Sequence, residues 1–113
     1  MIDATDATFE SEVLSSELPV LVEFTAPWCR PCKAIEPWLV ELGREHEGRL
    51  RVVQLDIDTN LRVPARYGVL SLPTVILFSG GEPVETIHGV QARRRYAEAV
   101  ARLLEPDAAE PAR

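Results

Sequence analysis

The chain has 113 residues, a formal net charge of -6 and a hydrophobic share of 46%. This length suits one domain, because domains most often have roughly 100–150 residues. The acidic balance argues against nonspecific binding of nucleic acid, and the one basic cluster, residues 93–95, is short. The longest apolar runs fall far below the roughly 18 residues that a membrane span needs. The first residues carry no export signal, so we expect a cytoplasmic protein without membrane or nucleic-acid partners.

Hydrophobic patterning predicts alternating helices and strands in the first half of the chain. Two segments have apolar residues at helical spacing and are expected to be helices: residues 8–16 and 32–46. Two apolar runs that are rich in β-branched residues are expected to be strands: residues 20–24 and 50–57. Because a helix separates these strands, we expect them to run parallel, joined by a right-handed crossover.

The second half of the chain predicts a short helix, a hairpin and a final helix. Asn60 is expected to cap a helix over residues 61–67, and Gly68 would end it. Gly80 and Gly81 are a strong two-residue hairpin signal. The remaining expected elements are the two hairpin strands and a last helix: residues 74–78, 82–88 and 91–104. The pattern predicts an α/β fold in which a mixed central β-sheet is flanked by helices on both faces.

The end of the chain differs in composition from the rest. From Glu105 onward it holds two prolines and no large apolar residue. We therefore expect one domain over residues 1–104 and a disordered tail over residues 105–113. The chain has no internal repeats, and a monomer is the default expectation.

The two cysteines, Cys29 and Cys32, are the main candidates for reactive groups. Two thiolates alone leave a zinc ion incompletely coordinated, so we expect no metal site unless two chains share an ion. The pair lies between a predicted strand and a predicted helix, and a helix N-terminus stabilises a thiolate. The spacing lets Cys32 reach the sulfur of Cys29, so the pattern predicts dithiol–disulfide chemistry. The alternative is a pair of small, buried and inert side chains.

Residues 20–33, VLVEFTAPWCRPCK, closely resemble the active-site region of thioredoxins. The resemblance continues through LDID at 55–58, YGV at 67–69 and LPT at 72–74, and it covers nearly the whole expected domain. It implies a thioredoxin fold and a protein-disulfide reductase without a bound cofactor. Cys29 would attack the substrate disulfide, and Cys32 would resolve the mixed disulfide. The partners would be disulfide-containing proteins and a thioredoxin reductase that restores the dithiol.

Glu23 is a third candidate for a catalytic residue. It lies between apolar neighbours in an expected buried strand, where burial raises the pKa of a carboxyl group. The resemblance implies that it helps to deprotonate Cys32, although the family usually has Asp at this position. The alternative is that Glu23 lies on a solvated strand face.

The resemblance also implies a substrate-binding surface. Pro73 would follow a cis peptide bond and turn the Leu72 backbone toward a bound substrate strand. The alternative is an ordinary trans proline at the start of a strand. The other residues that we expect at this surface are Trp28, Arg30, Pro31 and Gly89.

Three positions depart from the family pattern. Arg30 stands where the commonest motif has Gly, and its charge favours the Cys29 thiolate, which would make the pair more oxidising than a typical thioredoxin. Gln54 lies where many members carry a lysine near the buried acid, and Thr25 replaces an aromatic residue. Two alternative functions stay open. Arg30 would suggest a more oxidising thioredoxin-like oxidant or isomerase, and the other alternative is a thioredoxin-fold interaction module without catalysis.

Overall fold

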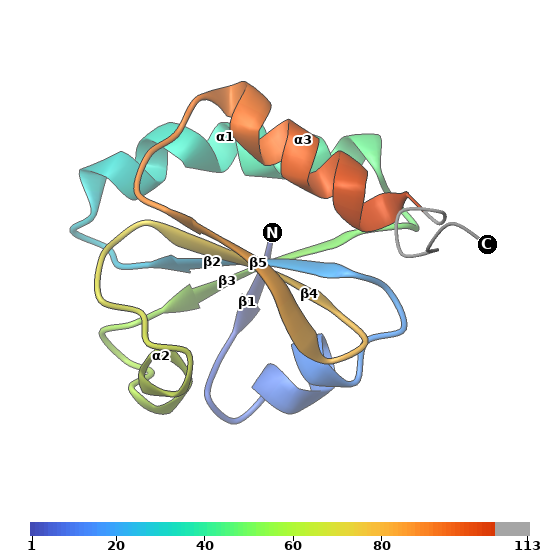
Figure 1. Ribbon diagram of the computed structural model, residues 1–113. Helices are drawn as coiled ribbons and strands as arrows, with labels where there is room; N and C mark the ends of the chain where they lie inside the picture. Colours follow the sequence, from blue (N-terminus) through green and yellow to red (C-terminus); the bar gives the residue numbers. More distant parts are fainter. Residues whose placement is uncertain (106–113) are drawn as a thin grey trace.

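A five-stranded mixed β-sheet divides the computed structural model, which describes residues 1–105, into two layers of helices (Figure 1). The strand order across the sheet is β1-β3-β2-β4-β5. The strands are β1 (Ile2–Ala4), β2 (Val20–Thr25), β3 (Arg51–Asp56), β4 (Thr74–Ser79) and β5 (Glu82–His88). The first three pair in parallel, whereas β4 pairs antiparallel with both β2 and β5. The predicted mixed sheet is therefore confirmed.

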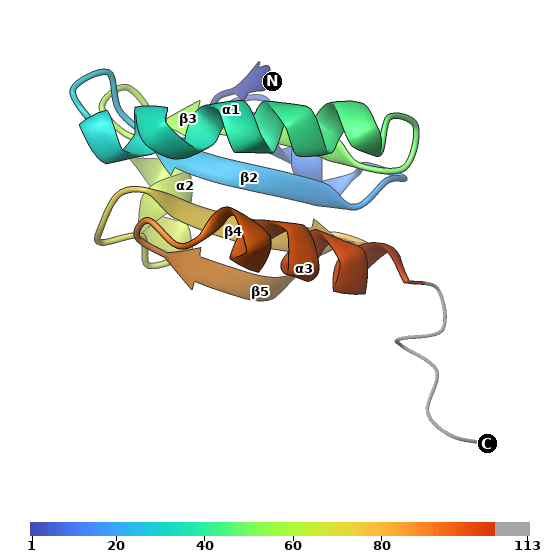
Figure 2. The same ribbon diagram turned by 90° about the horizontal axis from the view of Figure 1, so that it is seen from above.

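Helices cover both faces of this sheet, as predicted. The helices α1 (Arg30–Glu45) and α3 (Arg93–Leu104) lie side by side on one face (Figures 1 and 2). The short helix α2 (Arg62–Arg66) and the π-helical turn η1 (Glu10–Leu14) lie on the other face. None of the helices in residues 1–105 is long and apolar enough to cross a membrane.

Strand β1 and the start of helix α1 differ from the sequence prediction. Strand β1 was missed, because its three residues are too few to give a periodic pattern, and it pairs only at the sheet edge with β3. Helix α1 begins at Arg30 rather than at residue 32, because Cys29 is its N-cap and Pro31 is accommodated in its first turn. The earlier start places both cysteines at the helix N-terminus.

The central strand β2 determines where the candidate acid lies. All six residues of β2 are buried, and their side chains alternate between the two faces of the sheet. Leu21 packs in the core beneath α1 and α3, whereas Val22 and Phe24 pack in the core on the α2 side. The alternation therefore puts Glu23 on the same face as Leu21, beneath the helices α1 and α3.

Helix α2 is capped by a residue that is distant in sequence. The backbone N–H groups of Arg62 and Val63 donate to the carboxylate of Asp6, at 3.0 and 2.9 Å. The prediction that Asn60 caps this helix was wrong. Asn60 accepts a hydrogen bond from the Asp6 backbone N–H and donates to the carbonyl of Asp56, so it holds two loops together. The end of α2 is as predicted, since Gly68 follows it with a positive φ of 67°.

Replacing Asp6 with alanine is expected to lower the melting temperature by about 5 °C, because two helix N–H groups lose their acceptor. Thermal unfolding followed by circular dichroism measures this shift. Glu17→Ala, which changes an exposed acid in the loop before β2, is the matched control and should melt like the parent. Equal melting temperatures for both variants would contradict the capping role.

The predicted hairpin is also present. Gly80 and Gly81 join β4 to β5 with positive φ angles of 60° and 83°, which glycine adopts without steric cost. The predicted tail falls, apart from Glu105, outside the described residues.

Candidate active site

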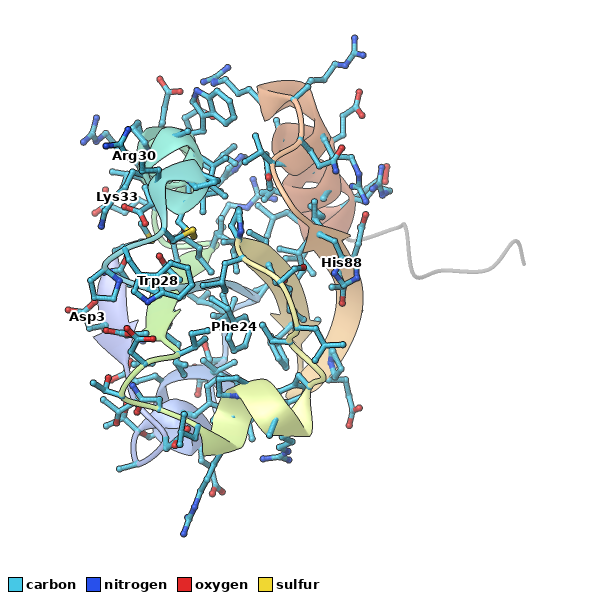
Figure 3. All side chains as sticks on the ribbon, turned by 90° about the vertical axis from the view of Figure 1, so that its left-hand side faces the viewer. Asp3, Phe24, Trp28, Arg30, Lys33 and His88 are labelled. Carbon is cyan, nitrogen blue, oxygen red and sulfur yellow. A yellow bond between two sulfur atoms is a disulfide. The ribbon has the colours of Figure 1, made fainter. Side chains whose placement is uncertain are left out.

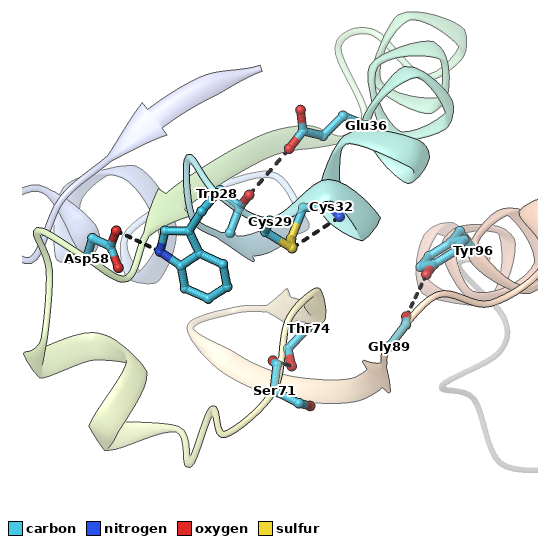
Figure 4. Close-up of a disulfide and its surroundings, with 10 residues drawn as sticks. Trp28, Cys29, Cys32, Glu36, Asp58, Ser71, Thr74, Gly89 and Tyr96 are labelled. Carbon is cyan, nitrogen blue, oxygen red and sulfur yellow. Dashed lines mark hydrogen bonds between the residues drawn. A yellow bond between two sulfur atoms is a disulfide. The ribbon is translucent and has the colours of Figure 1, made fainter.

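A disulfide between Cys29 and Cys32 lies at the N-terminus of α1 (Figure 4). The two Cα atoms are 5.4 Å apart, and the backbone N–H of Cys32 donates to the Cys29 sulfur at 3.2 Å. Cys29 is 3% exposed and Cys32 is 0% exposed. The open N–H groups and the dipole of the helix start favour negative charge at this point. Such a site stabilises a thiolate on Cys29 whenever the disulfide is opened.

An apolar groove of about 350 Å³ lies beside the disulfide. It brings together four of the predicted substrate-binding residues, Trp28, Arg30, Pro31 and Leu72. Cys29 lines this groove and Cys32 does not. The other lining residues are Ile57, Val69, Leu70 and Ser71. An open apolar groove next to a reactive sulfur suits the binding of an unfolded or extended segment of another protein.

Trp28 lies at the surface of this groove, not in the core (Figure 3). Its side chain is 65% exposed, and its indole N–H donates to the carboxylate of Asp58 at 2.9 Å. This hydrogen bond holds the indole ring between Asp58 and the disulfide (Figure 4).

Pro73 and Gly89 form a second part of the site. The Leu72–Pro73 peptide bond is cis, as expected, and Leu72 packs against the cluster of Cys29 and Cys32. The backbone N–H of Gly89 donates to the carbonyl of Pro73 at 2.8 Å. The loop after β5 is thereby tied to the loop before β4.

Tyr96 is a residue of this region that sequence reasoning missed. Its side chain is 0% exposed, its hydroxyl donates to the Gly89 carbonyl at 3.0 Å, and it accepts from the Gln91 N–H at 3.1 Å (Figure 4). From α3, Tyr96 therefore sets the shape of the loop at residues 89–91. In the sequence it looked like an ordinary apolar position of a helix, because the spacing gives no sign of the hydroxyl's partners.

Glu23 is fully buried, and within residues 1–105 no hydrogen-bond partner reaches either of its carboxylate oxygens. Burial, and then the nearby charge of Glu36, raise the pKa of Glu23 to about 9, while Lys33 opposes the shift. Gln54 is the direct neighbour of Glu23 on β3, but its amide donates instead to Asp3 at 2.7 Å. The solvated alternative is wrong, because Glu23 is a buried carboxyl group that holds a proton near neutral pH.

Glu36 is an acidic residue near Glu23 that the sequence analysis missed. The hydroxyl of Thr25 donates to its carboxylate at 3.4 Å, a contact drawn in Figure 4. Thr25 and Glu23 share one face of β2, so Glu36 approaches both of them from α1. Thr25, which replaces the aromatic residue found in many family members, therefore contacts Glu36 through its hydroxyl group.

The chain was compared with known proteins, and the family model for thioredoxin matches residues 1–102. The chain belongs to the thioredoxin family. Thioredoxin 1 of Nostoc sp. (strain PCC 7120) is 39% identical over 88% of this chain and 94% of its own length. The thioredoxin of Rickettsia felis is 44% identical over 80% of this chain and 87% of its own length. The bifunctional thioredoxin reductase/thioredoxin of Mycobacterium leprae is 48% identical over 81% of this chain but 20% of its own length.

Membership of the thioredoxin family confirms the predicted fold and the predicted chemistry. Like other thioredoxins, the chain is a thiol–disulfide oxidoreductase that reduces protein disulfides. The redox-active group is the Cys29–Cys32 pair in its WCxxC setting. The separate roles of the surrounding residues remain predictions.

Proposed function

We propose that Cys29 attacks the substrate disulfide and that Cys32 completes the exchange. The observation that carries this assignment is that Cys29 lines the groove, whereas Cys32 is fully buried behind it. The Cys29 thiolate attacks one substrate sulfur, and the other substrate sulfur leaves as a thiolate that takes a proton from water. Cys32, as a thiolate, then attacks the Cys29 sulfur. This second step forms the Cys29–Cys32 disulfide and releases the first substrate sulfur, which is protonated in turn.

Cys32 must lose its proton before it can attack, and we propose that Glu23 accepts this proton. Both side chains are 0% exposed, so water competes poorly for this role. Near neutral pH most of Glu23 is protonated, so the proton acceptor is its ionised fraction, and a pKa of about 9 makes that carboxylate a strong base. When the disulfide is later reduced, the same proton can return to the Cys32 sulfur.

The groove is proposed to bind an extended segment around the substrate disulfide. Trp28, Arg30 and Pro31 would contact its side chains, while the Leu72 backbone would pair with it as an added strand. Gly89 would border the same segment, since it is hydrogen-bonded to Pro73. The exposed side chain of Leu70, at 97%, extends the apolar contact surface.

We propose that a thioredoxin reductase restores the dithiol and that the chain acts as a monomer. A reductase partner is supported by the Mycobacterium leprae relative, whose printed name joins thioredoxin reductase and thioredoxin in one protein. A cytoplasmic location fits the same cycle, because that compartment keeps thiols reduced.

An equilibrium redox titration of the Cys29–Cys32 pair tests the direction of this chemistry. A two-electron transition near about −270 mV is expected for a general reductant. A potential near about −200 mV or higher would favour the oxidant or isomerase instead. Alkylation of free thiols followed by mass measurement gives the reduced fraction in each buffer.

Replacing Arg30 with glycine is expected to lower this potential by about 10–30 mV, because the Cys29 thiolate loses a neighbouring positive charge. The effect is small since Arg30 is exposed and water screens its charge. Arg30→Lys keeps the charge and is the matched control, which should titrate like the parent. An unchanged potential in Arg30→Gly would leave Arg30 with a role in substrate selection alone.

A further inference from the structure

The carboxyl group of Glu23 is fully buried and has no hydrogen-bond partner among the residues that the structure describes. A buried polar group without a partner lowers the stability of the fold, so an unpaired carboxyl group at this position indicates a functional role or a partner that is bound only part of the time. The nearest candidate donor on the neighbouring strand, the Gln54 amide, is engaged by Asp3. Val75 stands opposite Glu23 on β4 and offers no polar group.

Glu36 is the group that approaches Glu23 from the helix above it. Thr25 lies two residues along β2 from Glu23, on the same face, and its hydroxyl bonds the Glu36 carboxylate. Two carboxylates repel each other, and they can hydrogen-bond only when one of them holds a proton. The charge of Glu36 raises the pKa of Glu23, although no hydrogen bond joins the two carboxyl groups within the described structure. A hydrogen bond between Glu23 and Glu36 would therefore form only while the pair holds a proton.

A cavity connects Glu36 to water. Its volume is about 420 Å³, and its lining includes Thr25, Lys33, Glu36 and Gln54. Asp3 and Lys33, which also line it, are exposed, so the cavity is open to solvent. Glu23 does not line the cavity and is fully buried. Glu36 thus lies between the buried carboxyl group and the water that could exchange its proton.

We propose that Glu36 shares the proton of Glu23 and passes it to water in this cavity, so that the two carboxyl groups form one relay behind Cys32. The inference rests on the proposed role of Glu23 as the proton acceptor. Glu36 is a positioning residue in this scheme, because it acts on the sulfurs only through Glu23.

The proton balance of the relay is simple. Glu23 first loses its own proton to water through Glu36, and its carboxylate then takes the proton of Cys32 as the S–H bond breaks. The Cys32 thiolate then attacks the Cys29 sulfur. The protonated Glu23 then donates a hydrogen bond to the Glu36 carboxylate, and the proton can leave through Glu36 to water. Other groups that face Glu23 are Lys33 from α1, which favours the carboxylate, and Tyr96 from α3.

The test is the titration of Glu23 in the full-length disulfide form of Glu36→Gln, followed through the carbon-13 shift of the Glu23 carboxyl carbon. Removing the negative charge is expected to lower the titration midpoint by about one pH unit. Glu36→Asp retains a carboxylate and should restore at least part of the shift. Glu45→Gln makes the same chemical change at an exposed site on α1 and should leave the midpoint unchanged.

The pH profile of protein-disulfide reduction is the second readout. In Glu36→Gln, the profile should move toward lower pH in parallel with the Glu23 titration. A Glu36→Gln variant that folds and titrates like the parent would overturn the relay. If Glu23→Gln itself leaves the pH profile unchanged, the proposed role of Glu23 fails, which is a different outcome from failure of Glu36.

Discussion

Replacing Cys29 with serine is expected to reduce the rate of protein-disulfide reduction to that of the uncatalysed reaction. A serine hydroxyl does not exchange with disulfides, and Cys32 cannot substitute for it because its side chain is fully buried. Turnover of an insulin disulfide assay in the presence of excess dithiol measures the loss.

Replacing Cys32 with serine is expected to give a different defect. Cys29 still lines the groove and attacks, but nothing resolves the mixed disulfide, so substrate remains covalently bound to Cys29. Non-reducing electrophoresis and intact-mass measurement detect this adduct.

The double variant Cys29→Ser/Cys32→Ser is the control for both experiments and should neither turn over nor trap substrate. Stable adducts on Cys29→Ser, through Cys32, would reverse the two assignments. Full turnover by Cys32→Ser would show that a second chain thiol is not needed for release.

Replacing Glu23 with leucine is expected to stabilise the disulfide form, and increasingly so as the pH rises. In the unfolded chain this carboxyl group ionises near pH 4.5, whereas in the folded chain its pKa is about 9. Between these values the folded state binds the extra proton, so the parent loses stability at about 1.4 kcal/mol per pH unit. The penalty is absent below pH 4.5 and reaches about 3 kcal/mol at pH 7.

Urea unfolding at pH 5, 7 and 8.5 measures this effect. The parent should become less stable along the series relative to Glu23→Leu, whereas Glu45→Gln should follow the parent. The stabilised variant should also lose activity, because Cys32 has lost its proton acceptor. A constant difference between parent and Glu23→Leu across these pH values would contradict the high pKa.

The cysteine pair and the acid behind it were predictable because their signals are local. Cys29 and Cys32 are close in sequence at a strand-to-helix junction, and Glu23 interrupts an apolar strand. The chemistry of such short segments is fixed largely by their own residues. The helices and strands, and from their order the layers of the fold, were predictable because each element has its own hydrophobic periodicity.

The partners of these residues could not be predicted, because they come from distant elements. Asp6 caps α2 across the loop after β1, and Tyr96 reaches Gly89 from α3. Glu36 looked like a solvated helix residue, and only the packing of α1 over β2 brings it to Glu23. Each of these contacts depends on the tertiary fold, for which a single sequence carries no periodic signal.

The position of the disulfide on the first turn of α1 links the redox potential to the stability of the fold. Its two cysteines are three positions apart, so opening the bond requires no rearrangement of strands or helices. Folding and disulfide reduction therefore form a closed thermodynamic cycle with four states. If folding stabilises the disulfide relative to the dithiol, the free energy of unfolding of the oxidised form exceeds that of the reduced form by the same amount. Two denaturation curves, one for each redox form, would thus measure how far folding shifts the potential of the cysteine pair from its value in the unfolded chain.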